Sequence, residues 1–168
     1  MVSMLTRLIR HLLLPGWSVR KAFPAPAMAR IQQAIARAES RHGGQIRFAV
    51  EAALHPLPLL RGVDARDRAL EVFSLLRVWD TEHNNGVLIY LLLADRQVEI
   101  VADRGVHAAL GAIEWERICR DMEELLRTGR FEDAALAGID AVSRHLQARY
   151  PRRPSGPNEL SDAPVVIR

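Results

Sequence analysis

The stretch Trp79–Gly105, WDTEHNNGVLIYLLLADRQVEIVADRG, decides the fold of this chain. It holds two apolar runs, 86–93 and 98–102, separated by a few polar residues, which is the pattern of an antiparallel β-hairpin. The first run has no polar interruption, and this predicts a central strand that is covered on both faces. Because the strands are antiparallel, the acid-rich segments 80–85 and 103–104 at their outer ends should lie side by side.

Strands and helices alternate on both sides of this hairpin. Residues 45–53 alternate between apolar and polar side chains, which predicts a half-buried strand. Asp64 and Asp67 form a variant of the N-terminal capping box at the start of a helical segment. Apolar side chains recur at helical spacing in segments 27–41, 64–78, 113–127 and 131–148. This order predicts an α/β fold in which a small mixed sheet is sandwiched between helices.

The composition indicates one domain with short extensions. Of 168 residues 49% are hydrophobic, which is enough for a sizeable core. We expect an N-terminal helix and linker over 1–22, the α/β domain over 23–150 and a flexible proline-rich tail over 151–168, whose apolar end could dock on a groove or sheet edge. The hydrophobic part of the N-terminus is too short for a signal peptide, and no apolar run reaches the roughly 20 residues that span a bilayer. We therefore expect a cytoplasmic protein.

The N-terminus is basic and amphipathic. The first 38 residues contain six cations and no acid, and residues 2–14 place apolar side chains on one helical face. A helix of this kind beside a tryptophan can lie on an anionic membrane surface. The alternative is a helix that packs on its own domain or on a partner protein. The residues concerned are Leu5, Arg7, Leu8, Ile9, Arg10, Leu12 and Trp17.

The acid-rich ends of the hairpin are the best candidate for a binding site. Asp80, Glu82 and Asn84 are spaced two apart, and Asp103 should lie near them across the hairpin. Clustered oxygen ligands suit a hard cation, so we predict that these four residues bind Ca²⁺ or Mg²⁺. The spacing is not that of an EF-hand, because position twelve is Leu91. In the alternative interpretation, Asp80 and Asn84 only form a turn by bonding nearby backbone amides.

Other polar residues of the hairpin are candidates for weaker roles. Asn85, Arg104 and His107 could contact a partner or an anion, and Arg104 could also form an exposed ion pair with Asp103 worth about 0–1 kcal/mol. Asp95–Arg96, at the opposite end of the hairpin, is interpreted as turn chemistry.

No nucleophile for hydrolysis is evident. The single cysteine, Cys119, lies in the apolar stripe of its helix and is interpreted as a core thiol. The sequence has no P-loop and no Gly-x-Ser-x-Gly motif. Nucleic-acid binding is not expected either, because the basic segment lacks interleaved aromatic residues and a recognised motif.

The hairpin also resembles the TPM domain family. The features that match are Asn85–Gly86, the run Val87–Tyr90, Asp95–Arg96, Val98–Val101 and Asp103–Gly105, with Trp115 and parts of 129–139 beyond them. The resemblance covers roughly residues 27–150 and is to the short bacterial branch that lacks a membrane anchor. It implies an α/β/α sandwich.

The resemblance implies a range of functions. Some members are acid phosphatases, some bind calcium, and others are accessory subunits of membrane complexes, often encoded in bacteria beside LemA-like membrane proteins. We expect a binding or accessory module, peripheral to the cytoplasmic face of the inner membrane, with a LemA-like protein as partner and a divalent cation at the hairpin end. The alternative is a metal-dependent acid phosphatase, which only the resemblance suggests.

Overall fold

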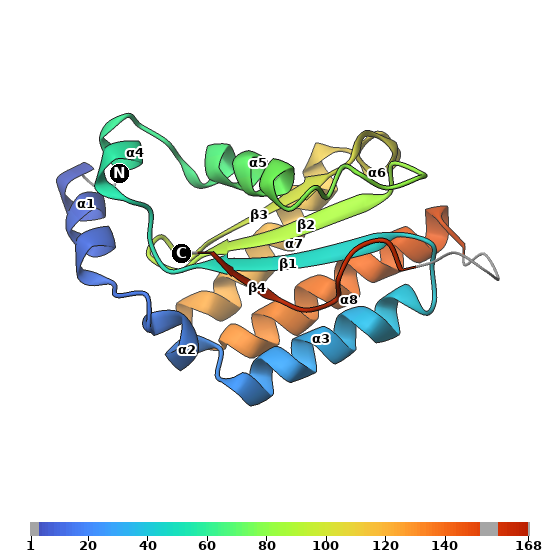
Figure 1. Cartoon of the computed structure of the whole chain (residues 1–168), viewed down its shortest axis with the longest axis horizontal. Helices are drawn as coiled ribbons and strands as arrows, with labels where there is room; N and C mark the ends of the chain where they lie inside the picture. Colours follow the sequence, from blue (N-terminus) through green and yellow to red (C-terminus); the bar gives the residue numbers. More distant parts are fainter. Residues whose placement is uncertain (1–3, 152–157, 168) are drawn as a thin grey trace.

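A four-stranded sheet forms the middle layer of the molecule (Figure 1). The computed structural model describes residues 4–151 and 158–167, without the side chains of 109 and 110. The strands are β1 (Gln45–Glu51), β2 (Gly86–Leu92), β3 (Gln97–Ala102) and β4 (Val165–Ile167), in the order β3-β2-β1-β4. β1 runs parallel to both β2 and β4, while β2 and β3 form the predicted antiparallel hairpin. The mixed sheet confirms the α/β fold class.

Helices cover both faces of this sheet (Figure 1). One face is covered by α3 (Ala25–Glu39), α7 (Ala112–Arg127) and α8 (Phe131–Arg149), and the larger hydrophobic cluster lies beneath them. The other face is covered by α5 (Ala65–Leu75) over a smaller cluster. β2 supplies both clusters and is buried along its whole length, which confirms the predicted central strand.

The four longer helices agree with the sequence analysis, and the shorter ones extend it. The side chain of Asp64 accepts the N–H of Asp67 at 2.8 Å, so the predicted capping box begins α5. α1 (Met4–Leu13) matches the predicted N-terminal helix. Three short helices occupy segments in which no helix was predicted: α2 (Ser18–Ala22), α4 (Pro56–Leu60) and α6 (Arg104–Leu110).

The C-terminal segment, residues 158–167, lies along the outer edge of β1. The side-chain oxygen of Gln45 accepts the N–H groups of Glu159 and Leu160 at 3.0 and 2.9 Å. Arg47 donates to the carbonyl oxygens of Ser161 and Ala163. The segment ends as β4, so the apolar end of the expected tail docks on a sheet edge. The rest of that tail, 152–157 and 168, lies outside the described residues.

Glu39 is a half-buried carboxyl at the end of α3, close to the C-terminal segment. It accepts the N–H of Ile46 at 2.6 Å. Burial, together with the negative charge of Asp162, raises the pKa of Glu39 to about 8, although Ile46 and Arg47 act in the opposite direction. Glu39 therefore keeps its proton at neutral pH in the folded chain.

This pKa predicts a pH dependence of stability. Because the pKa of Glu39 is about 8 in the folded chain and 4.5 in the reference state, its contribution to stability is complete below pH 4.5 and is lost as the pH rises to about 8. The side chain that Glu39→Gln introduces would stay neutral at every pH. We therefore expect Glu39→Gln to reduce the decrease in unfolding free energy between pH 4.5 and about 8, as measured by urea titrations. The same substitution at the exposed Glu124 is the control. Parallel curves for the wild type and Glu39→Gln would contradict the prediction.

Candidate functional site

The two polar ends of the hairpin meet where β2 begins. Asp103 follows the last residue of β3, and its N–H donates to the carbonyl oxygen of Gly86 at 2.9 Å. Asn85 precedes Gly86, and its carbonyl oxygen accepts the N–H of Gln45 at 3.1 Å. Asn85 and Asp103 therefore approach each other around Gly86, next to the start of β1, as the antiparallel register predicted.

Each of these two residues has a buried oxygen atom without a hydrogen-bond partner among the described residues. Asp103 caps α6 by accepting the N–H of Arg104 at 2.6 Å through Oδ1, and its Oδ2 has no donor. Asn85 donates to the carbonyl oxygen of Gly43 through Nδ2, and its Oδ1 has no donor. A buried acceptor that lacks a donor costs free energy, so each of these two oxygen atoms would be stabilised by a further partner such as an ordered water or a bound ligand.

Further oxygen atoms lie against the start of α6. A Cβ atom added at Gly105 would lie 2.8 Å from the carbonyl oxygen of Asn84 and 2.8 Å from the hydroxyl of Tyr150. Burial, and then the charge of Asp103, raises the pKa of the Tyr150 hydroxyl. Only a glycine fits here, so the turn before β2, the start of α6 and the end of α8 come together. Tyr150 carried no signal in the sequence because it lies far from the hairpin.

The other predicted cation ligands have different surroundings. Asp80 is exposed and forms an ion pair with Arg77 at 2.6 Å, and Glu82 is exposed beside Glu159. Asn84 has a φ of 50°, the left-handed conformation of a turn former. Among the described residues, no three His, Cys, Asp or Glu side chains are grouped so that they could hold a metal ion. The four-residue ligand set stays a prediction, and Asp103 is the member of that set with a buried side-chain oxygen that lacks a partner among the described residues.

The turn before β2 is held by a residue that no motif in the sequence singled out. The N–H of Asn85 donates to the hydroxyl of Thr81 at 3.1 Å, and both residues are buried. Thr81 therefore makes the side-chain contact that the turn interpretation gave to Asp80 and Asn84. A threonine among several acids and amides gave no signal of its own.

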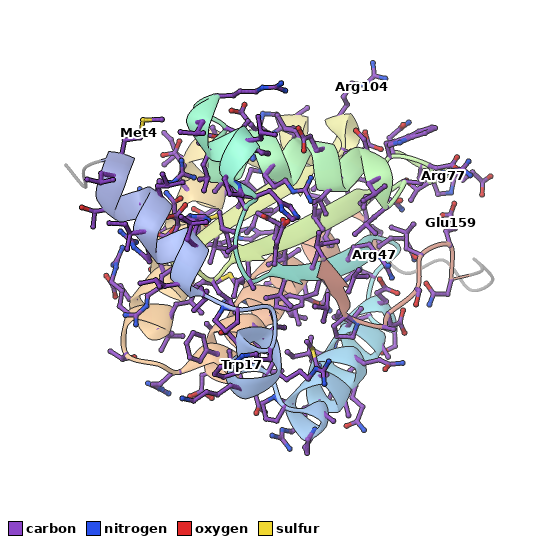
Figure 2. All side chains as sticks on the ribbon, turned by 60° about the vertical axis from the view of Figure 1, so that its left-hand side comes forward. Met4, Trp17, Arg47, Arg77, Arg104 and Glu159 are labelled. Atoms are coloured by element: carbon purple, nitrogen blue, oxygen red, sulfur yellow. The ribbon has the colours of Figure 1, made fainter. Side chains whose placement is uncertain are left out.

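Arg104 and His107 lie on the exposed side of α6. Arg104 projects outward from the rim of the molecule, on the same side as Arg77 and Glu159 (Figure 2). His107 is exposed and lines a cavity of about 480 Å³ along β3, which Trp115 and Cys119 also line. Burial, followed by the charge of Glu99, raises the pKa of Cys119 to about 12, so its thiol is protonated at neutral pH and is not a nucleophile there.

A second candidate surface lies on α1, whose polar side faces the domain. Asp95 is the centre of this contact: its carboxylate lies 2.9 Å from Arg7, 3.1 Å from His11 and 3.9 Å from Arg10. His11 also accepts the N–H of Leu54 at 2.9 Å. The turn that holds Asp95 is present, because Arg96 has a φ of 52°. Asp95 is therefore more than a turn residue, since it fixes the rotation of α1.

The apolar side of α1 consequently faces outward. The exposed fractions of Ile9, Leu12 and Leu13 are 46%, 60% and 75%. Met4 and Trp17 continue this surface beyond them (Figure 2). Leu8 is the exception and packs on the smaller core cluster. None of the described helices is long and apolar enough to cross a bilayer.

Comparison with known proteins identifies one family model and similar solved structures. The model of the TPM domain matches residues 21–145. The NMR structure of the BA42 protein from the psychrophilic bacterium Bizionia argentinensis superposes with a TM-score of 0.76 and 26% identity, covering 86% of this chain and 95% of that chain. The NMR structure of the N-terminal domain of a P. gingivalis protein has a TM-score of 0.62 and 17% identity, covering 84% and 95%, and supports the fold alone. No curated protein matches the chain.

The role of Asp95 can be tested by substitution. Asp95→Ala removes the carboxylate that lies against Arg7, Arg10 and His11 of α1, so we expect a loss of roughly 3 kcal/mol in unfolding free energy, near the cost of breaking a buried ion pair. Trypsin should also cleave after Arg7 and Arg10 faster. Asp80→Ala removes an exposed ion pair and should cost only about 0–1 kcal/mol. Equal losses in the two variants would show that Asp95 does not anchor α1.

Proposed function

This chain belongs to the TPM domain family, and on that premise we propose that it is a binding or accessory module that docks on a membrane surface through α1. The family match agrees with the resemblance read from the hairpin. The observation that carries the docking proposal is the orientation of α1, with its polar side on the domain and its apolar side in solvent.

The orientation of α1 is the reverse of that of most helices on soluble domains. A surface helix ordinarily buries its apolar stripe and exposes its charges. Here Ile9, Leu12 and Leu13 are exposed beside one another at helical spacing, while Arg7 is held at Asp95. Apolar surface is stabilised by about 25 cal/mol for each Å² removed from water, so insertion at the lipid interface would supply the free energy of docking.

Charge has a smaller part in this proposal than the sequence suggested. Arg7 and Arg10 were named as candidates for a contact with a membrane or a partner, but both lie against Asp95 of the chain's own domain. The exposed cations left beside the surface are Arg20 and Lys21, and each could add about 1 kcal/mol on anionic lipid. The proposed contact is therefore mainly hydrophobic. The cytoplasmic face of the inner membrane and a LemA-like partner stay proposals that rest on the family resemblance.

Liposome flotation tests the docking. We expect the full chain to float with vesicles of mixed zwitterionic and anionic lipid, and Leu12→Ser/Leu13→Ser to lose most of this binding because it removes exposed apolar area. Leu70→Ser/Leu75→Ser is the matched control, since both leucines are exposed on α5. These variants are better than deletion of residues 1–22, which would remove the buried Val19. Equal flotation of both variants would refute docking through α1.

We also propose a divalent cation site at the hairpin end. The supporting observation is the pair of unpartnered buried oxygens, Asp103 Oδ2 and Asn85 Oδ1. Oxygen ligands of this kind suit Ca²⁺ or Mg²⁺. With one carboxylate and one amide as side-chain ligands, the site would bind a cation more weakly than a site with several carboxylates.

A metal titration followed by residue-resolved NMR tests this site. We expect Ca²⁺ or Mg²⁺ to shift the backbone signals of 83–86 and 103–106 together. Asp103→Asn should abolish this response, because it removes the one charged ligand of the proposed pair. Asp80→Asn should leave the response intact. If Asp80→Asn and Glu82→Gln abolish it as well, the four-residue ligand set is correct and the smaller set is wrong.

A metal-dependent acid phosphatase is the alternative function. It would require the same cation to activate a water molecule, because the thiol of Cys119 is protonated at neutral pH. Phosphomonoester hydrolysis that needs the added ion and is lost in Asp103→Asn, with the fold intact, would favour this alternative. Absence of turnover with calcium, magnesium or manganese at acid and neutral pH would argue against the phosphatase and favour the binding module.

A further inference from the structure

The two edges of the sheet are covered in different ways. At the β3 edge, side chains of the neighbouring helices meet the outward backbone groups. The N–H of Val98 donates to Glu123 of α7 at 3.1 Å, and Arg66 of α5 donates to the carbonyl oxygen of Ile100 at 2.8 Å. These residues all lie within the part of the chain that matches the TPM domain. The β3 edge is thus closed by the domain itself, which disfavours pairing with a further strand.

The β1 edge is closed by a segment that lies outside the TPM match. The C-terminal segment follows residue 145, where the match ends, and pairs with β1 through Ala49↔Val165 to Glu51↔Ile167. Without this segment, the outward backbone groups of β1 would be unpaired and open to another strand that runs parallel to β1. Such an edge accepts any extended chain that fits its register and side-chain contacts.

The contacts between β1 and this segment are specific. Gln45 accepts two successive N–H groups of the segment, and Arg47 donates to two of its carbonyl oxygens. Leu160 is buried in the smaller core cluster, and the carboxylate of Glu159 accepts the N–H of Glu82 at 2.8 Å. The segment therefore carries a sequence that β1 recognises through both backbone and side chains.

We propose that the β1 edge also accepts the C-terminal segment of a second copy of this chain, so that two copies exchange these segments. Every contact described above would re-form between the copies, because the recognised segment and the recognising edge belong to the same sequence. The exchange would bring the second copy's Glu159 to the turn before β2. The inference is independent of the proposed membrane docking and cation binding.

The length of the linking sequence sets the protein concentration at which exchange between copies competes with pairing inside one chain. Residues 150–157 read YPRRPSGP, so only eight residues separate the last helix from the recognised segment. A short linker gives an effective local concentration on the order of 1 mM for the intramolecular contact. The exchanged dimer should therefore be minor at about 10 µM and prominent near 1 mM.

Two single-cysteine variants in a Cys119→Ser background test the exchange. Ala49 and Val165 are paired in the ladder, so a chain with Ala49→Cys mixed with a chain with Val165→Cys can form the matched disulfide only if a segment has moved between copies. We expect this mixed disulfide to increase with protein concentration on non-reducing gels. The exposed Ser74→Cys mixed with Val165→Cys measures random collision. Equal yields in the two mixtures would overturn the proposal.

Light scattering on chains without added cysteine gives a second measurement. We expect the wild type to contain dimer near 1 mM, at the effective concentration of the linker. Leu160→Asp should lose the dimer, because the buried leucine is part of the recognition. Leu12→Ser/Leu13→Ser should keep it, which separates segment exchange from association through the apolar side of α1. A wild type that stays monomeric at this concentration, or a dimer that depends on Leu12 and Leu13, would refute the exchange.

Discussion

Strand β2 is buried on both faces, and the rest of the structure depends on this burial. Alternate side chains enter the two core clusters, with Ile89 in the larger cluster and Leu88 in the smaller one. A strand of this kind is stable only when a layer of apolar groups covers each face, which requires helices on both sides of the sheet. The same burial fixes the register of the hairpin, since a slip by one residue would exchange the two faces.

Burial of β2 also creates a need for polar partners inside the fold. The hydroxyl of Tyr90 donates to Glu51 at 2.7 Å, and Arg68 of α5 contacts both carboxylate oxygens of Glu51 at 2.9 and 3.0 Å. This network ties α5 to β1 and β2, so the layer on that face is positioned by charge as well as by apolar contact. Because separation of this pair would leave the buried carboxylate of Glu51 without its partner, arrangements that move α5 away from β1 are destabilised.

The N-terminal and C-terminal segments are added to this core by specific polar contacts. Asp95 holds α1 with its basic side inward, and Gln45 with Arg47 holds the C-terminal segment on β1. In both places a few hydrogen bonds and ion pairs determine which apolar groups are covered. They leave the apolar side of α1 exposed and bury Leu160. The proposed membrane surface and the proposed exchange therefore both follow from polar contacts with the core.

Much of the fold could be predicted from the sequence because it depends on local periodicity. The unbroken run of β2, the alternation in β1 and the capping box at Asp64 each specify an element within a few neighbouring residues. The alternation predicted a half-buried β1, however, and this was wrong, because α5 and its cluster cover the second face of the strand. The short helices α2, α4 and α6 could not be predicted in this way. Each has fewer than eight residues, and a helix of that length is stabilised mainly by its tertiary contacts.

The sequence by itself determined that the polar ends of the hairpin meet, since the antiparallel register follows from the order of apolar residues. The tertiary structure decided which oxygens are buried there, namely those of Asp103 and Asn85, with Tyr150 beside them. It also decided that α1 turns its basic side inward. A helical pattern indicates which residues share a face. Contacts between residues far apart in the chain determine which partner that face meets, and here the partner is Asp95.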